Sequence, residues 1–293
     1  FLTYVRRLYR PLATVSEAGV RMGRATAGAE RLLEVLREPA EDSTRGRVAP
    51  SFAGEITYRD VHFAYSRGAQ ALKGVSFTVP AGAFVVLTGP NGAGKSTIIS
   101  LLLRLIDPTR GDVLIDWERI QEFQLSSYRL RFAYVPQQVQ LFGATVRENI
   151  LYGRPDATEE QMQQAARVAL LEEVIARLPG GYDAMLGEGG ETLSGGEGRR
   201  LMIARAALRD ARVLLLDEPL AGLDPEARDV VARAIRQAAA GRTTIVVSHE
   251  PVSDFDPDGV IALEDGRVTE AAGTVDGRVD AGVMGSGKPA GPA

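Results

Sequence analysis

A glycine-rich loop at residues 89–96 constrains what this chain can fold into more than any other feature of its sequence. The loop matches the pattern G-x-x-x-x-G-K-[ST] in full, directly after the apolar run Phe84–Thr88 and directly before a predicted helix. In such a loop, glycines let consecutive backbone N–H groups converge on phosphate oxygens, and the helix N-terminus adds the positive end of its dipole. The pattern therefore predicts a strand–loop–helix unit that binds a nucleotide. Its residues are Gly89, Pro90, Asn91, Gly92, Ala93, Gly94, Lys95 and Ser96.

Side chains in and beyond the loop supply the chemistry that a bound nucleotide requires. Lys95 is expected to reach the β- and γ-phosphates, and the hydroxyl of Ser96 is expected to bind Mg²⁺. The apolar run Val213–Leu216 ends in Asp217 and Glu218. Asp217 is expected to hold Mg²⁺, and Glu218 then stands where it can polarise an attacking water. An apolar run that ends in acids is common by itself, so only its combination with the loop makes it informative.

The composition excludes several other classes of function. The chain has 293 residues, of which 34 are Lys or Arg and 38 are Asp or Glu, for a net charge of −4. Nucleic acid is therefore not expected as a partner, because nonspecific nucleic-acid binders carry an excess of positive charge. The absence of cysteine excludes disulfides, thiolate metal sites and thiol catalysis. With only His62 and His249, a metal centre built from several histidines is excluded too.

The chain is expected to divide into four parts. Residues 1–38 are predicted to form one long helix, 39–51 a linker, 52–270 the nucleotide-binding domain, and 271–293 a disordered tail rich in Gly, Ala and Pro. The glycine-rich stretch 285–288 in that tail lacks a preceding strand and is rejected as a phosphate loop. No run of about 18 to 20 apolar residues is present to span a membrane. Because the chain begins with Phe1 and not Met, a segment upstream is expected.

Two interpretations of the N-terminal helix are open. Apolar or small residues recur three and four positions apart along it, which by itself predicts an ordinary amphipathic helix. Three arginines within its first ten residues instead favour a helix that descends from the cytoplasmic side of a membrane. The stripe consists of Leu12, Val15, Gly19, Met22, Thr26, Ala29, Leu33 and Leu36.

The domain itself is expected to be α/β. Residues 54–79 alternate with the period of strands and predict an antiparallel portion. From Phe84 on, short and nearly continuous apolar runs, such as Val213–Leu216 and Thr244–Val247, predict parallel strands that are covered on both faces. Glu159–Leu178 and Glu197–Leu208 have helical composition and spacing between these runs.

At this point the chain resembles the ATPases of ABC transporters, and six motifs in the family's order carry the resemblance. Leu193–Glu197 is similar to the signature LSGGQ, and residues 221–224 are similar to the D-loop. Tyr65 matches the A-loop aromatic, Gln137 the Q-loop and His249 the switch histidine; the phosphate loop and the acidic strand complete the set. The resemblance implies a P-loop NTPase with a mostly parallel core sheet, an N-terminal antiparallel β subdomain and an inserted helical subdomain.

The resemblance also implies a role for each matching residue, with ATP and Mg²⁺ as the ligands. Glu218 would act as base, while His249 and Lys95 would stabilise transition-state charge. Gln137 would sense Mg²⁺ and water, and Ser96, Gln137 and Asp217 would surround the metal. Two copies would meet head to tail, so that the signature of one completes the site of the other. The implied nucleotide contacts are residues 89–96 together with Tyr65, Thr97, Gln137, Ser194, Gly195, Gly196, Glu197 and Asp224.

Finer features resemble the exporter branch of the family. Leu141–Ile150 is similar to the segment after the Q-loop in exporters, and residues 187–190 resemble their x-loop. Residues 1–38 then resemble the cytoplasmic extension of an exporter's last transmembrane helix. This implies an ATP-hydrolysing domain at the cytoplasmic face of the cell membrane. Its partners would be the transmembrane domain of the same transporter and a second ATPase domain, identical or not.

The sequence departs from the family pattern at several positions. Glu197 replaces the usual glutamine of the signature, and Gly222 replaces the usual alanine of the D-loop. Gly189 stands where the x-loop commonly has arginine. Trp117 replaces a common turn glycine, so a different hairpin turn is expected there.

Two alternatives stay open beside the exporter. One is a soluble ABC ATPase outside transport, although this chain lacks the long coiled coil or the second ATPase domain of the known types. The other is a non-hydrolysing half of a heterodimer. Glu218 and His249 disfavour that half, whereas the glutamate in the signature keeps it open for the site completed in trans.

Overall fold

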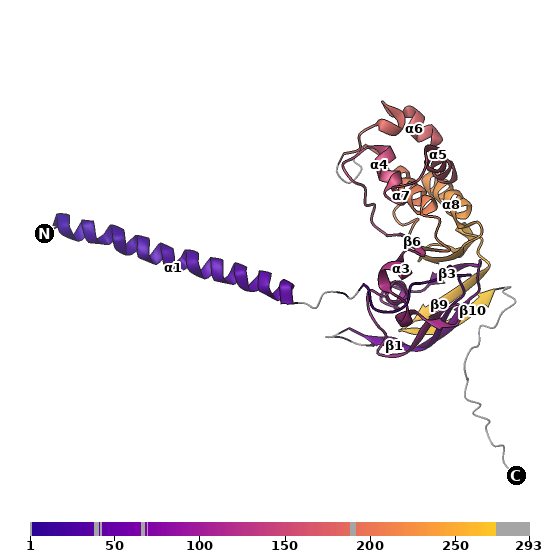
Figure 1. Ribbon diagram of the computed structural model, residues 1–293, viewed down its shortest axis with the longest axis horizontal. Coiled ribbons are helices and arrows are strands. Elements are labelled where there is room, and N and C mark those ends of the chain that lie inside the picture. The colour runs from indigo at the N-terminus through magenta and orange to yellow at the C-terminus, as the bar shows by residue number, and fades with distance from the viewer. Residues whose placement is uncertain are drawn as a thin grey trace, which may run out of the picture. The chain divides into compact units, whose positions relative to one another are not determined.

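The computed structural model describes residues 2–37, 41, 43–65, 68, 70–187 and 192–273, with side chains from residue 18 on except that of residue 35. The chain forms two units, Phe1–Ser43 and Thr44–Ala293. The first unit contains the helix α1, Leu2–Arg37, as the periodic pattern predicted (Figure 1). The stripe members Met22 and Leu36 have 72% and 77% of their surface exposed. Among the described residues, none of the helices has the length and apolar character that a membrane span requires.

A six-stranded sheet forms the centre of the second unit. Its strand order is β10-β9-β3-β8-β7-β6, and all neighbouring pairs are parallel except β10 with β9. Alternate residues of one strand enter different cores: Val86 faces one, and Val85 and Leu87 face the other. This two-sided burial explains the continuous apolar runs of the sequence. The strands are β3 (Phe84–Thr88), β6 (Phe132–Val135), β7 (Val213–Asp217), β8 (Thr243–Val247), β9 (Gly259–Glu264) and β10 (Arg267–Gly273).

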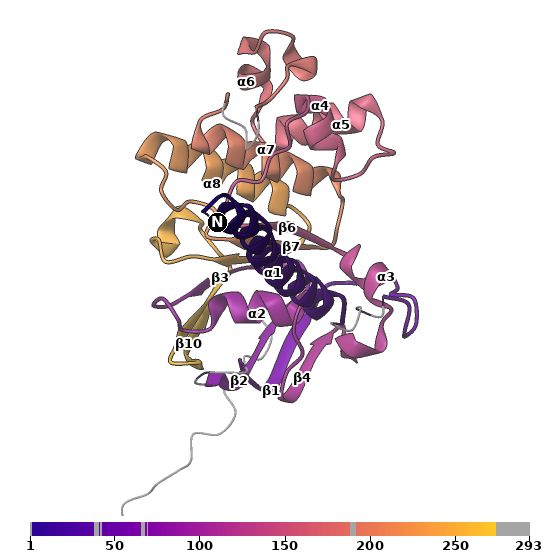
Figure 2. The same cartoon turned by 90° about the vertical axis from the view of Figure 1, so that its left-hand side faces the viewer.

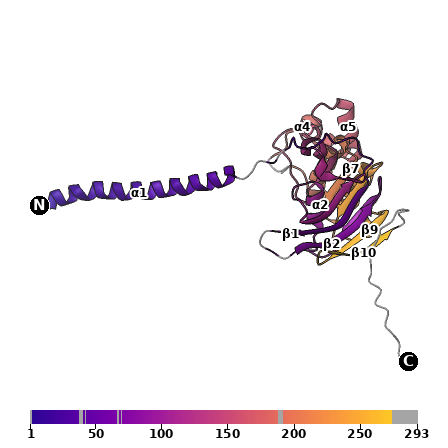
Figure 3. The ribbon, with the colours of Figure 1, turned by 60° about the horizontal axis from the view of Figure 1, so that its bottom comes forward.

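A four-stranded antiparallel sheet of order β2-β1-β4-β5 covers one side of this centre. Figure 3 shows β1 and β2 beside β9 and β10, and β2 contacts β10. The buried Tyr58 of β1 donates a hydrogen bond of 2.8 Å to the carbonyl of Ile98, which fixes this sheet to the helix after the glycine-rich loop. The strands are β1 (Ile56–Ala64), β2 (Gln70–Val79), β4 (Arg110–Ile115) and β5 (Glu118–Arg119). The predicted antiparallel subdomain is thereby confirmed.

A helical subdomain is inserted between β6 and β7, and α7 of this insertion packs against α8 (Figure 2). The sequence pattern predicted one helical stretch over Glu159–Leu178, but the structure divides it at Leu170, whose φ is +55°. The helices are α2 (Lys95–Leu102), α3 (Leu125–Arg129), α4 (Val146–Leu151), α5 (Glu159–Val168), α6 (Glu172–Arg177), α7 (Gly195–Leu208) and α8 (Pro225–Ala239). Short 3-10 helices are η1 (Ile120–Glu122), η2 (Gly181–Asp183) and η4 (Val252–Asp254).

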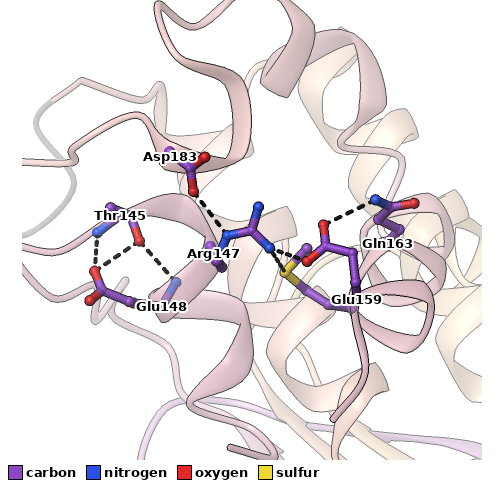
Figure 4. Close-up of polar contacts among 7 residues, drawn as sticks. Thr145, Arg147, Glu148, Glu159, Gln163 and Asp183 are labelled. Atoms are coloured by element: carbon purple, nitrogen blue, oxygen red, sulfur yellow. Dashed lines mark hydrogen bonds and ion pairs between the residues drawn. The ribbon is translucent and has the colours of Figure 1, made fainter.

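Arg147 ties the start of the helical subdomain together. Its guanidinium donates a hydrogen bond of 2.9 Å to Asp183 and pairs with Glu159 (Figure 4). Arg147 belongs to α4, and this helix begins with a capping box. The Thr145 hydroxyl accepts from the backbone N–H of Glu148, and the Glu148 carboxylate accepts from the backbone N–H of Thr145. The segment after the Q-loop therefore has a fixed entry into α4.

The structure revises the predicted boundaries at both ends of the domain. Ala49, placed in the linker 39–51, is only 1% exposed, and its N–H donates to Ser127 at 2.9 Å. The chain is thus already packed before residue 52. At the other end, residues 271–273 belong to β10 and pair with β9, so they are not part of a tail. The remaining predicted tail, 274–293, lies outside the described residues.

The turn between β4 and β5 consists of Asp116 and Trp117. Asp116 and Trp117 have φ values of +48° and +69°, which is the backbone of a type I′ hairpin turn, although neither residue is glycine. Trp117 thus adopts a positive φ despite its large side chain. The Asp116 carboxylate accepts backbone hydrogen bonds from Ala53, Gly54 and Glu55 at 2.6, 2.9 and 2.9 Å, which holds the turn in place.

Candidate active site

The glycine-rich loop connects β3 to α2 and has a backbone that only glycine can adopt at two positions. A Cβ at Gly89, whose φ is +143°, would lie 2.1 Å from the carbonyl oxygen of Leu263. A Cβ at Gly94, whose φ is +103°, would lie 2.6 Å from a methyl group of Leu72. At Gly92 nothing lies within 4 Å, so this side of the loop is open. The loop thus packs tightly on its strands and presents its backbone on the other side.

Lys95 begins α2 and is only 6% exposed. Its Nζ donates hydrogen bonds of 2.7 and 3.0 Å to the carbonyls of Gly89 and Pro90. The ammonium group is therefore held inside the loop. Ser96 follows at the helix start and is exposed.

Tyr65 lies next to the start of α2, although 32 residues separate it from Thr97. Its hydroxyl is 3.3 Å from the Thr97 hydroxyl, and the ring of Phe63 packs edge-on against it at 4.8 Å. About half of Tyr65, 52%, remains exposed. An exposed ring that is braced from one side can stack on a flat aromatic ligand.

Glu218 stands at the centre of the candidate active site. Its carboxylate accepts a hydrogen bond of 2.6 Å from Nε2 of Gln137, and Nδ1 of His249 lies 3.3 Å from its other oxygen. These three residues come from the ends of three neighbouring parallel strands, β6, β7 and β8. Because carboxyl ends of parallel strands meet at one edge, the topology gathers residues that are far apart in sequence.

The backbone of Glu218 is strained and held by specific contacts. Its φ is +46°, a left-handed conformation that is costly for a residue with a side chain. The Glu218 N–H donates to the carbonyl of Val247 at 2.8 Å, and its own carbonyl accepts from Nη1 of Arg199 at 2.8 Å. Arg199, only 7% exposed, extends from α7 to Glu218. Arg199 was not predicted as a site residue, because an arginine on a predicted helix gives no signal of its target.

Asp217 ends β7 beside this group. Burial and the neighbouring Glu218 carboxylate raise the pKa of Asp217, whereas Lys95 acts in the opposite direction. The hydroxyl of Tyr134 hydrogen-bonds Asp217. Burial, together with the negative charge of Asp217, raises the pKa of Tyr134 to about 12. Tyr134 is a second residue that was not predicted from the sequence. Parallel pairing of β6 with β7 brings Tyr134 to this place.

The oxygen donors expected for Mg²⁺ fit a hard cation. A carboxylate, a hydroxyl and a side-chain amide are the ligand types that Mg²⁺ prefers. Two adjacent carboxylates, Asp217 and Glu218, with the pKa of Asp217 raised, form a site that a divalent cation would stabilise. Within the described ranges there is no cluster of three His, Cys, Asp or Glu residues that could hold a metal without other ligands.

The signature residues form a second group, on the helical subdomain. Ser194 caps α7, and its hydroxyl accepts from the N–H of Glu197 at 3.3 Å. Asp224 caps α8 by accepting from Ala227 at 2.9 Å, which is a helix-start role. A Cβ at Gly196 would lie 3.0 Å from that of Ala227, so Gly196 lets the two helix starts approach.

The two groups are not joined by polar contacts within the described part of the chain. The hydrogen bonds and ion pairs of Ser194 and Glu197 reach only each other, Arg177 and the first turn of α7.

Gly222, which replaces an alanine of the D-loop, has φ +71° with nothing within 4 Å, a conformation that glycine adopts without strain. Three of the four x-loop residues, 188–190, lie outside the described residues.

Known proteins resemble this chain over most of its length. Residues 72–221 match the profile of a family described as ABC transporter. An ATP-dependent lipid A-core flippase of Chromohalobacter salexigens is 38% identical over 272 residues, which cover 92% of this chain and 47% of the flippase. A multidrug efflux ATP-binding/permease protein of Mycobacterium bovis is 38% identical over 271 residues, which cover 92% of this chain and 23% of that protein.

A solved structure is similar in fold as well as in sequence. It is described as a bacterial Atm1-family ABC exporter with ATP bound. The TM-score is 0.77 at 35% identity, over 94% of this chain and 48% of that one. This chain thus spans about half the length, or less, of these relatives.

Proposed function

The chain belongs to the ABC transporter family, and from this premise we propose that it binds and hydrolyses ATP as the nucleotide-binding domain of an exporter. One observation carries the proposal: Gln137 and His249 both contact the carboxylate of Glu218, at the strand edge where the phosphate loop also lies. A carboxylate held by two polar side chains is suited to accept the proton of an attacking water.

The residues around the loop divide the remaining work. The backbone N–H groups of residues 89–96 and the Lys95 ammonium bind the phosphates and stabilise the negative charge that develops on them. Gln137 and Arg199 keep Glu218 in place, one through its carboxylate and the other through its carbonyl. Mg²⁺, held by Ser96 and Asp217 beside Gln137, would neutralise charge on the phosphate oxygens. The exposed ring of Tyr65 stacks on the nucleobase.

We assign the second group to another ATPase domain. Ser194 and the first turn of α7 offer backbone N–H groups and a helix dipole to a phosphate. Their polar contacts stay within the helical subdomain, which supports a nucleotide that is bound by the P-loop of a partner chain. Two ATP molecules would then be enclosed head to tail, and hydrolysis would let the pair open.

We assign a groove near the Q-loop to the transmembrane domain. A cavity of about 560 Å³ lies between β6 and α7 and is lined by residues that include Tyr134, Tyr152 and Arg205. Phe142 packs on Tyr152 at 4.6 Å, and both rings are well exposed. This exposed aromatic surface lies beside Gln137, which contacts the Glu218 carboxylate. It suits a partner domain that must respond to ATP. The relatives extend well beyond the region that matches this chain, which supports the membrane domain as occupant and the cytoplasmic face as location.

Glu218→Gln tests hydrolysis. The isosteric amide removes the base but leaves the fold and the phosphate contacts, and a positioned base contributes about 10²- to 10⁴-fold. Turnover should therefore fall at least about a hundredfold while ATP binding persists. Glu160→Gln, at an exposed position in the first turn of α5, is the matched control and should keep normal turnover. Near-normal hydrolysis by Glu218→Gln would mean that another group activates the water.

The same variant tests the pairing of two chains. ATP should remain uncleaved in Glu218→Gln, so a stable ATP-dependent dimer should appear by size-exclusion chromatography. Lys95→Ala should lose nucleotide binding and dimerisation together. Specific activity of the unaltered chain should rise with its concentration, and strictly constant specific activity down to nanomolar protein would contradict the composite site.

A further inference from the structure

The signature helix α7 carries a carboxylate in its first turn. Oε2 of Glu197 accepts a hydrogen bond of 2.9 Å from the N–H of Ser194, so one oxygen completes the helix cap. A glutamine could make the same contact without a charge. The additional property of Glu197 is therefore its full negative charge at a helix start where an incoming phosphate would also bind.

Arg177 takes the second oxygen of that carboxylate. Its Nη2 pairs with Oε1 of Glu197, and it comes from the last residue of α6, twenty positions earlier in the chain. The Glu197 side chain is 14% exposed and that of Arg177 is 65% exposed. Burial by itself would raise the pKa of Glu197, but the Ser194 N–H and the Arg177 guanidinium outweigh it and leave that pKa lowered. Glu197 is thus ionised at neutral pH.

Besides Glu197, the space in front of the signature is lined by two further carboxylates, those of Asp224 and Glu226. A cavity of about 330 Å³ in front of the signature has three carboxylates and one guanidinium, that of Arg200, in its lining. Nη1 of Arg200 donates to the carbonyl of Leu170, and Arg200 interacts with Glu197 through its charge without a hydrogen bond between them. A helix N-terminus attracts anions, but an unbalanced carboxylate in its first turn would oppose a phosphate. The lining consists of Ser194, Gly196, Glu197, Arg200, Asp224, Glu226, Ala227 and Val230.

We propose that Arg177 is a positioning residue of the composite ATP site, which neutralises Glu197 so that the start of α7 can receive the phosphate of a nucleotide bound by the partner chain. The inference rests on the proposed function, since that function brings the phosphate to this helix. Arg177 acts through Glu197 and does not itself touch the nucleotide. Arg177 and Glu197 are therefore a matched pair that together replace the uncharged glutamine usual at this position.

A double-mutant comparison in the Glu218→Gln background tests the pair. The measurement is the ATP-dependent monomer–dimer equilibrium by sedimentation. Arg177→Met should weaken dimer formation roughly tenfold, because one unit charge is left a few ångströms from a phosphate. With Glu197→Gln also present, Arg177→Met should change the dimerisation constant by less than about twofold. Arg177→Lys, which keeps the charge, should restore most of the association, and Arg167→Met on α5 is the matched control.

Two further readouts separate charge from packing. The effect of Arg177→Met should shrink as ionic strength rises, because salt screens exposed charges. ATP binding to the monomer, measured at low protein concentration, should stay within about twofold of the parent, because the P-loop belongs to the same chain. A weaker monomer affinity, or an effect insensitive to salt, would overturn the inference.

The failures of the two proposals can be told apart. If Glu218→Gln itself forms no ATP-dependent dimer, the composite site of the proposed function is wrong. If that dimer forms and Arg177→Met does not weaken it, only the present inference is wrong. An equal loss with and without Glu197→Gln would also overturn it, because Arg177 would then act by another route. Arg177 is largely exposed, and a thermal unfolding curve of each variant confirms that it is folded.

Discussion

The amide of Gln137 donates a hydrogen bond of 2.6 Å to the carboxylate of Glu218, across a sequence separation of 81 residues. The bond joins the loop after β6 to the end of β7, which are neighbours in the parallel sheet. It connects the loop that borders the cavity between β6 and α7 to Glu218, which we propose as the catalytic base.

Gln137→Ala should impair turnover more than nucleotide binding. A hydrogen bond to a charged group contributes about 1.5–3 kcal/mol, so losing it should lower kcat by roughly tenfold to a hundredfold. ATP affinity should change little, since the phosphates are bound by the loop. Steady-state kinetics and calorimetric titration measure the two effects. Gln138→Ala is the adjacent control, and an equal loss of affinity and kcat would contradict this division.

Tyr65→Ala should weaken the binding of ATP and of GTP alike. Stacking of a base on an aromatic ring contributes about 1–3 kcal/mol and discriminates little between bases. Affinity for both nucleotides should therefore fall by roughly fivefold to a hundredfold, as fluorescence titration would report. Tyr65→Phe keeps the ring and loses only the contact with Thr97, so it should bind nearly normally. Unchanged affinity in Tyr65→Ala would remove this residue from the site.

Gly89→Ala should destabilise the domain even without nucleotide. Its Cβ would lie 2.1 Å from the carbonyl of Leu263, so either β9 or the loop must move. Gly92→Ala shares the cost of a positive φ but meets no atom within 4 Å. Overpacking costs about 1–3 kcal/mol, so Gly89→Ala should unfold at lower denaturant concentration than Gly92→Ala. Identical midpoints would show that the loop can shift freely.

Trp117→Gly should stabilise the domain. A side chain in the left-handed region destabilises the folded state by roughly 1–2 kcal/mol. Glycine removes this cost but loses more conformational entropy on folding, which offsets about 0.5–1 kcal/mol of the gain. Trp117 is 71% exposed, so the loss of packing is small. Calorimetry should find a Tm higher by about 2–4 °C. Trp117→Val, which is branched at Cβ, should lower Tm, and a lower Tm for both variants would mean that the ring packs usefully.

The sequence by itself predicted the local units of this protein, because their residues are neighbours in the chain. The phosphate loop depends on backbone conformations that glycines permit, and its flanking strand and helix depend on local periodicity. The helix starts at Ser194 and Asp224 depend on side chains that cap their own backbone. The order of the motifs added the family resemblance, which the comparisons then confirmed.

Only the tertiary structure decided which distant side chains act together. The parallel order of β6, β7 and β8 brought Gln137, Glu218 and His249 into contact. The packing of α7 and α6 gave Arg199 its target in the Glu218 carbonyl and Arg177 its partner in Glu197. A long charged side chain on a helix surface can reach many groups. Its partner therefore depends on how helices and strands pack, which local sequence does not specify.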